Sequence, residues 1–134
     1  MPNGVRFAQA GLTALAQAVG GDLFRDTLPT DADRISLVRV IPDHDDVPAQ
    51  PVLSAARRAL PPGGALTLAE PMSDTPGAEP IGEAYFGFYL LAMGSGRPRT
   101  CAELTAMLKR AGFGRVQEVA TRRPIMIRLL VARC

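Results

Sequence analysis

The chain has 134 residues, of which 47% are hydrophobic and 21% are charged, and this composition suits one globular domain. No apolar run reaches the ~18 residues that a membrane span needs. The N-terminus also lacks the pattern of a secretion signal, so we expect a soluble, cytoplasmic protein. Two cysteines and one histidine are too few for a zinc site with four nitrogen or sulfur ligands, and we expect no metal site.

The net charge of +2 is unevenly distributed along the chain. Residues 1–96 hold 6 basic and 11 acidic side chains, whereas residues 97–134 hold 9 basic and 2 acidic ones. A basic region suggests nucleic acid as a partner. However, its basic residues alternate with apolar ones at helix and strand spacing, and no aromatic platform accompanies them. We therefore interpret them as solvated helix and strand faces and expect no nucleic-acid partner.

The first half of the chain predicts a helix, a strand and a second helix. Residues 5–18 are rich in alanine and weakly helical, and Gly20-Gly21 ends this stretch. Residues 35–41 form an apolar run rich in β-branched side chains, which predicts a buried strand. Acidic N-cap candidates then precede a predicted helix over residues 47–60, with Pro48 in its first turn.

The second half continues the alternation after the break at Pro61 to Gly64. Thr100 and Glu103 have the spacing of a capping box at the start of an amphipathic helix. The other predicted elements are a strand over 65–70, a helix over 81–93 that is apolar on nearly every side, and two strands over 115–119 and 126–132.

Alternating strands and helices predict an α/β fold with a largely parallel sheet. The last two strands are close enough in sequence to pair as an antiparallel hairpin at the edge of that sheet. In such sheets ligands bind beyond the carboxyl ends of the strands. This expectation places the candidate functional rim at residues 39–46 and 70–72. Gly94-Ser95-Gly96 has the spacing of a phosphate-binding turn, but we discount it because it follows a helix rather than a strand.

Several short motifs occur in an order and spacing that resemble a known enzyme family. They are Gly20 to Phe24, Leu37 to Asp46, Leu60 to Gly64 and Leu68 to Pro71. Together they resemble the class I S-adenosylmethionine-dependent O-methyltransferases. Tyr85 to Met93 and Gly96 to Thr100 are more similar to one branch, the carotenoid O-methyltransferases of phototrophic bacteria, which act on hydroxyneurosporene or demethylspheroidene.

The resemblance implies that residues 1–134 are the C-terminal portion of a Rossmann-like catalytic domain whose N-terminal strands are missing. It implies S-adenosyl-L-methionine as the methyl donor and a hydroxylated, apolar small molecule as the acceptor. It also implies a homodimer in the full-length family. The family's glycine-rich loop and its acidic ribose-binding residue have no counterpart in this sequence. The alternative is therefore a catalytically silent remnant, or a module for dimerisation or other interactions.

The resemblance assigns cofactor-binding roles to Asp22, Leu23, Phe24 and Arg39. A carboxylate accepts hydrogen bonds from an exocyclic amine, and apolar side chains cover the faces of an adenine ring. The alternative for the first three is a tight turn with a buried phenylalanine. The alternative for Arg39 is an ion pair with a nearby aspartate, because an arginine in an apolar strand needs a partner.

The resemblance also implies catalytic roles for His44 and Glu70. Most relatives place a catalytic histidine where this chain has Pro42, and a second family glutamate falls at Pro98. His44 lies two residues further on and is our candidate base, with an exposed loop histidine as the alternative. Glu70 matches a glutamate that orients the base, and its alternative is an N-cap or loop carboxylate.

Four of the seven aromatic residues lie between Tyr85 and Tyr89. A helix that is apolar on every side is normally covered by another part of a protein. In the family this region lines the acceptor pocket, near the dimer contact. Ordinary core packing is the alternative interpretation.

Overall fold

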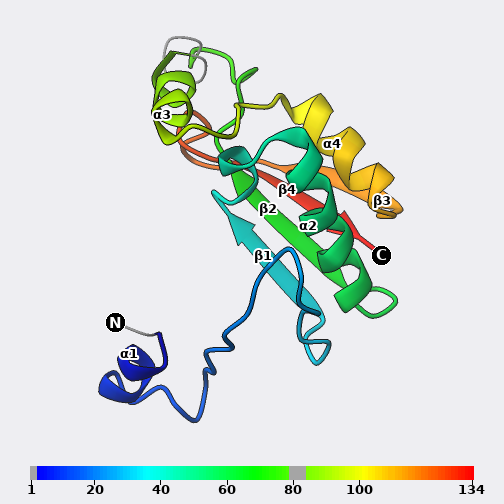
Figure 1. Ribbon diagram of the computed structural model, residues 1–134. Coiled ribbons are helices and arrows are strands. Elements are labelled where there is room, and N and C mark those ends of the chain that lie inside the picture. Colours follow the sequence, from blue (N-terminus) through cyan, green and yellow to red (C-terminus); the bar gives the residue numbers. More distant parts are fainter. Residues whose placement is uncertain (1–2, 79–83) are drawn as a thin grey trace.

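The computed structural model describes residues 3–78 and 84–134 (Figure 1). The elements, in chain order, are α1 (Asn3–Gln9), β1 (Arg34–Val38), the 3-10 turn η1 (Ile41–Asp43), α2 (Asp46–Ala59), β2 (Ala65–Glu70), α3 (Phe86–Met93), α4 (Cys101–Arg110), β3 (Arg115–Val119) and β4 (Arg128–Arg133).

The four strands form one mixed sheet in the order β1-β2-β4-β3. β1 pairs with β2 in parallel, while β4 pairs antiparallel with both β2 and β3. Three strands therefore run in one direction and β4 runs in the other. This confirms the predicted α/β fold and its C-terminal hairpin. β1 and β3 are the two edge strands, and β4 lies between β3 and β2.

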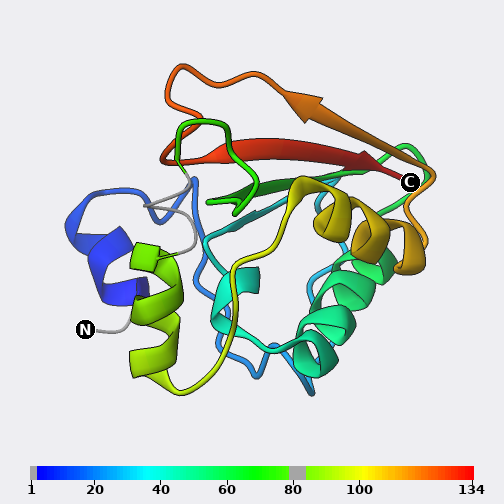
Figure 2. The same cartoon turned by 90° about the horizontal axis from the view of Figure 1, so that it is seen from above.

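Both amphipathic helices, α2 and α4, cover the same face of the sheet (Figure 2). Their apolar sides meet the buried residues of the central strands, and the core consists chiefly of Ile41, Val52, Leu53, Leu66, Leu68, Leu104, Leu108, Phe113 and Leu130. The predicted capping box starts α4: the Thr100 hydroxyl oxygen accepts a hydrogen bond from the Glu103 amide, and the Glu103 carboxylate accepts one from the Thr100 amide. The core thus fixes the carboxyl ends of β1 and β2, where the candidate site lies.

Three predicted elements differ from the structure. The N-terminal helix stops at Gln9 instead of residue 18, because no apolar partner packs along the alanine-rich stretch, whose residues 8–15 are all exposed. β1 ends at Val38 instead of residue 41, since Arg39 adopts a left-handed backbone with φ of 55°. β4 begins at Arg128 because amides of the preceding turn bond back to the Arg123 carbonyl.

The predicted helix over residues 81–93 is described from residue 84 onward, because residues 79–83 lie outside the described chain. Phe86 and Leu90 of α3 are buried, but Tyr85, Phe88 and Leu91 are 67–76% exposed. The interpretation as ordinary core packing is therefore wrong for most of this helix. Within the described residues, no helix has the length and apolar character to cross a lipid bilayer.

Candidate functional site

The candidate site begins where β1 and β2 end. Because these strands are parallel and paired from Arg34–Ala65 to Val38–Ala69, their carboxyl ends meet at one edge of the sheet. Residues 39–46, here called the rim loop, follow β1, and Glu70 ends β2. The structure thus places Arg39, His44 and Glu70 at the same edge of the sheet, which is where the sequence predicts the rim.

Glu70 is fully buried beneath the rim loop. Its Oε1 accepts hydrogen bonds from the amides of Val40 and Ile41, each at 3.2 Å. Burial raises the pKa of Glu70 to about 7, and the nearby negative charge of Asp43 contributes in the same direction. Its Oε2 is buried and has no hydrogen-bond partner among the described residues. Glu70 therefore acts as a loop carboxylate that orders the turn after β1, with one oxygen left available.

Arg39 has a positive φ of 55°, a conformation that L-residues rarely adopt. Its amide donates to the Ala69 carbonyl at 3.0 Å, which keeps the chain attached to β2 past the end of β1. Its guanidinium carbon lies 5.5 Å from the centre of the Phe86 ring, within the range of a cation–π contact. The alternative ion pair with an aspartate does not occur among the described residues. A residue that has a strained backbone and holds its cationic side chain beside an aromatic ring is typical of a functional position.

His44 is half-buried at the end of the rim loop, so the alternative of an exposed loop histidine is wrong. Its ring meets the Phe24 ring edge to face, with centroids 5.1 Å apart. Phe24 itself is 49% exposed, which overturns the alternative of a buried phenylalanine. This contact joins the segment that follows Gly20-Gly21 to the loop that follows β1.

Asp22 lies in a tight turn, as one of the alternatives predicted. Its Oδ1 accepts from the Phe24 amide at 2.8 Å, and its own amide donates to Asp26 at 2.7 Å. Its carboxylate also forms an exposed ion pair with Arg25 at 3.5 Å. These bonds stay within five residues, so this turn is fixed mainly by its own sequence.

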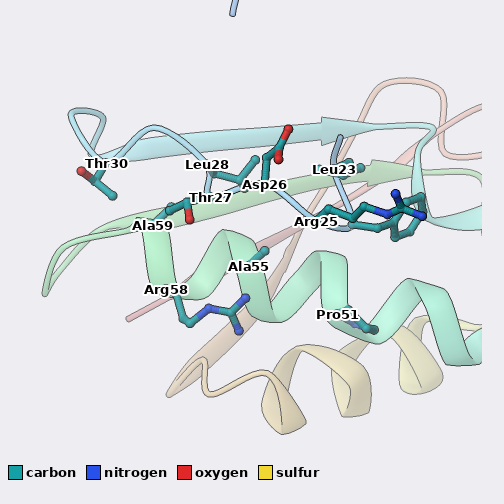
Figure 3. Close-up of a pocket in the computed structure, with 11 residues that line it drawn as sticks. Leu23, Arg25, Asp26, Thr27, Leu28, Thr30, Pro51, Ala55, Arg58 and Ala59 are labelled. Carbon is teal, nitrogen blue, oxygen red and sulfur yellow. The ribbon is translucent and has the colours of Figure 1, made fainter. Parts of the chain in front are cut away.

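Two cavities border the segment that contains Asp22. One, of about 230 Å³, is formed within residues 19–29 and includes Asp22 and Leu23. The other, of about 160 Å³, lies between residues 23–30 and α2, and Leu23 and Phe24 line it (Figure 3). Arg39 instead lines a narrow cleft of about 10 Å³ with Phe86 and Tyr89. Asp22 and Arg39 thus line different cavities, and Phe24 lines the cavity against α2 while its ring contacts His44.

The sequence did not predict the two buried arginines of the structure. Arg99 is only 2% exposed and donates hydrogen bonds to the carbonyls of Ile41 and His44 in the rim loop. Arg128 is also largely buried, between Asp74 and Glu118. The interpretation of the basic residues as solvated faces is therefore wrong for these two. No local pattern marks a buried arginine, since its partners lie far away in sequence.

No cluster of three or more potential metal-ligating side chains occurs in the part of the chain that the structure describes. The arrangement offers a buried carboxyl, a half-buried imidazole, a guanidinium and exposed aromatic rings. These groups suit hydrogen bonding and proton transfer to an organic ligand.

Comparison with known proteins identifies relatives across most of the chain. The O-methyltransferase domain family matches residues 3–114. Demethylspheroidene O-methyltransferase from Rhodobacter capsulatus is 40% identical over 112 residues, which cover 84% of this chain and 28% of the relative. The enzyme of the same name from Cereibacter sphaeroides is 40% identical over 129 residues, which cover 95% of this chain and 34% of the relative.

Solved structures agree with this match. LaPhzM shares 28% identity with a TM-score of 0.84, covering 97% of this chain and 38% of that one. Human N-acetylserotonin methyltransferase in complex with SAM shares 28% identity with a TM-score of 0.68, covering 84% and 32%. The chain spans about a third of the length of the curated relatives it matches. On the evidence of the family match and these relatives, the chain belongs to the O-methyltransferase domain family.

Proposed function

We propose that the protein acts in the transfer of a methyl group from S-adenosyl-L-methionine to a hydroxyl of an apolar small molecule. Membership of the O-methyltransferase family and the SAM-bound relative support this proposal. The observation that carries it is the contact between Phe24 and His44 at 5.1 Å. This contact joins the two motifs proposed for donor binding and catalysis, although Phe24 and His44 are 20 positions apart in the sequence.

The donor would be held by Asp22, Leu23, Phe24 and Arg39. The half-exposed Phe24 ring has the apolar face that an adenine needs, and the Asp22 carboxylate is a hydrogen-bond acceptor for its amine. Arg39 is exposed beside Phe86 and supplies a cation for the carboxylate of the donor. The chemistry of these side chains fits S-adenosyl-L-methionine, which when bound supplies the electrophilic methyl group.

We propose His44 as the group that takes the hydroxyl proton during methyl transfer. Imidazole exchanges protons near neutral pH, and no histidine occupies the usual family position at Pro42. Glu70 supports this role indirectly, because its carboxylate binds the two amides that start the turn leading to His44. Asp22 and Arg39 line different cavities, so a donor that contacts both must extend from one to the other past Phe24. The proposal depends on this placement of the donor.

For the acceptor we propose a hydroxylated carotenoid. The names of the two bacterial relatives support this class. The apolar surface of α3 supports it as well, because Phe88 and Leu91 are 71% and 76% exposed on the same helix that contributes Phe86 to the cleft at Arg39. A long polyene buries apolar surface along such a wall.

Titration calorimetry with S-adenosylhomocysteine tests the proposed donor site. We expect a dissociation constant below about 100 μM, which corresponds to about 5.5 kcal/mol. Arg39→Gln should weaken binding at least tenfold, whereas Asp31→Asn, an exposed change outside the cavities described above, should leave it unchanged. Absence of binding by a chain whose circular dichroism shows it folded would refute the proposal. Transfer of labelled methyl to demethylspheroidene in detergent then tests the acceptor.

A second candidate function is that of an interaction module, and the exposed face of α3 favours it. Tyr85, Phe88, Leu91 and Met93 are 54–76% exposed on one short helix. Apolar surface of this kind promotes self-association, in line with the homodimer expected from the family. Sedimentation velocity of the wild type and Phe88→Lys separates the two functions. Concentration-dependent dimers that Phe88→Lys abolishes, without any binding of S-adenosylhomocysteine, would support the module.

A further inference from the structure

The rim loop is held by a second segment, residues 94–99, which we call the clasp. Ser95 Oγ donates to the Asp43 carbonyl at 3.1 Å, and the Gly96 amide donates to Asp45 Oδ1 at 2.9 Å. The approach is so close that a Cβ on Gly96 would overlap the Pro42 carbonyl oxygen. The clasp follows α3 directly, so it connects the exposed aromatic helix to the rim loop.

Arg99 is the most deeply buried charged side chain of the clasp, at 2% exposure. Its Nη1 donates to the Ile41 carbonyl at 2.9 Å, and its Nη2 donates to the His44 carbonyl at 2.7 Å. The same guanidinium binds Asp46 Oδ1 through Nε at 3.0 Å and Nη2 at 2.8 Å. One rigid, planar group therefore fixes both ends of the turn from Ile41 to His44.

The backbone of Arg99 is also fixed. Its carbonyl accepts from the Ser73 amide at 3.1 Å, which anchors it to the loop after β2. The next residue, Thr100, is the N-cap of α4. The Arg99 backbone is therefore held on one side by the loop after β2 and on the other by the first turn of α4, and this fixes the point from which the guanidinium extends.

From these contacts we infer that Arg99 is a positioning residue of the candidate site, which sets the place of the His44 imidazole against Phe24. Its hydrogen bond to the His44 carbonyl fixes the backbone from which the imidazole extends. Its bond to Ile41 holds the same turn that Glu70 binds from beneath. A catalytic consequence of this inference rests on the proposed function, whereas the placement of His44 by Arg99 is independent of that function.

Arg128 offers a matched comparison for a purely structural arginine. It too is largely buried, with 12% of its side chain exposed, and it binds two carboxylates, Asp74 at 2.8 Å and Glu118 at 2.7 Å. Among the described residues its hydrogen-bond partners are Asp74, Thr75 and Glu118, none of which belongs to the rim loop. Loss of this guanidinium should therefore lower stability without moving His44.

The experiment compares Arg99→Lys with Arg128→Lys. A lysine keeps the charge but lacks the planar fork that reaches two carbonyls and a carboxylate together. His44 is the only histidine in the chain, so its imidazole gives a single set of NMR signals. We expect both variants to lower the melting temperature. Only Arg99→Lys should shift the His44 ring signals and weaken binding of S-adenosylhomocysteine, by about fivefold or more.

Asp46→Asn covers the case in which Arg99→Lys does not fold. Asp46 is exposed, and its replacement by asparagine weakens its ion pair with Arg99 and also its ion pair with Arg97 at 3.0 Å, while both arginines keep their charge. It should shift the His44 signals in the same direction and by a smaller amount. Unchanged His44 signals in the Arg99 and Asp46 variants, or an equal shift in Arg128→Lys, would overturn the inference. If the wild type binds no S-adenosylhomocysteine, the proposed function fails while the NMR comparison still decides the role of Arg99.

Discussion

The rim loop and the N-terminal segment of residues 19–30 both carry proposed ligand-binding side chains, but different contacts hold them. Bonds that reach the rim loop come from Glu70 and Arg99, 29 and 58 residues away from Ile41. The turn at Asp22 is closed by Phe24 and Asp26, two and four residues away. Hydrogen bonds between residues far apart in sequence form only when the whole domain folds. Hydrogen bonds between near neighbours can form a turn without the rest of the domain.

This difference predicts different responses to mutation. A change in the rim loop or its partners should disturb stability and ligand binding together, because the same bonds serve both. A change at Asp22 should affect ligand binding alone. The contact between Phe24 and His44 is where the two regions meet, so it should report on either one.

The largest effect is expected for Gly96→Ala. An added Cβ would overlap the Pro42 carbonyl oxygen and lie 2.7 Å from the Asp43 carbonyl carbon. Because these are backbone atoms, the rim loop must move away, and the positive φ of 88° adds strain. We expect a loss of about 3 kcal/mol or more in the free energy of unfolding, measured with urea.

Gly94→Ala is the matched control for this prediction. Gly94 has a similar φ of 80°, but a Cβ there meets no atom within 4 Å. It should lose only the roughly 1 kcal/mol of backbone strain. Equal losses in both variants would show that the close approach of the clasp to the rim loop does not matter for stability.

The next effect is a dependence of stability on pH caused by Glu70. Its pKa of about 7 in the folded protein lies above its ordinary value of 4.5. Between these values the folded state binds more protons than the unfolded state, so stability falls as pH rises from 4.5 to 7. The loss should be on the order of 3 kcal/mol, at about 1.4 kcal/mol for each pH unit.

Glu70→Gln isolates this effect, because the amide cannot ionise and its oxygen still accepts from the Val40 and Ile41 amides. Its urea midpoints should change less than those of the wild type between pH 4.5 and 7. Below pH 4.5 other carboxyls whose pKa values are lowered, such as Glu118 beside Arg128, destabilise both proteins as they protonate. Parallel pH profiles for the two proteins across the upper range would contradict the assignment.

Periodicity and capping patterns predicted the α/β fold because they are local. The strand over 65–70, the strand over 115–119 and the capping box of Thr100 and Glu103 all occur as the sequence predicts. The end of β1 was not predictable in this way. Val40 and Ile41 continue the β-branched run, but their amides donate hydrogen bonds to the buried Glu70 carboxylate instead of to a neighbouring strand. The chain therefore turns at this point.

Part of the candidate site could also be predicted from the sequence. The rule that ligands bind beyond parallel strands placed Arg39, His44 and Glu70 on one rim. Arg99 was not predictable, because the carbonyls of Ile41 and His44 that accept its hydrogen bonds lie 58 and 55 residues away in the sequence. Gly96 belonged to a discounted GxG pattern. Its role is close backbone contact with the rim loop, which only the tertiary structure reveals.

A smaller effect is expected at Arg39, where backbone and side chain contribute in opposite directions. Arg39→Gly removes the strain of a φ of 55° and also the cation beside Phe86. Arg39→Ala removes the cation but keeps the strain. We expect the glycine variant to be the more stable of the two by about 1 kcal/mol in urea unfolding. A more stable alanine variant would mean that the left-handed backbone is not maintained in solution.

The smallest change in stability should come from Asp22→Asn. The amide oxygen can still accept from the Phe24 amide, and the lost ion pair with Arg25 is exposed, so the free energy of unfolding should change by less than about 0.5 kcal/mol. Binding of S-adenosylhomocysteine should nevertheless weaken about tenfold, because a carboxylate accepts more strongly than an amide from the adenine amine. Unchanged affinity, measured by calorimetry beside Asp31→Asn, would remove Asp22 from the donor site and leave its turn with a local role only.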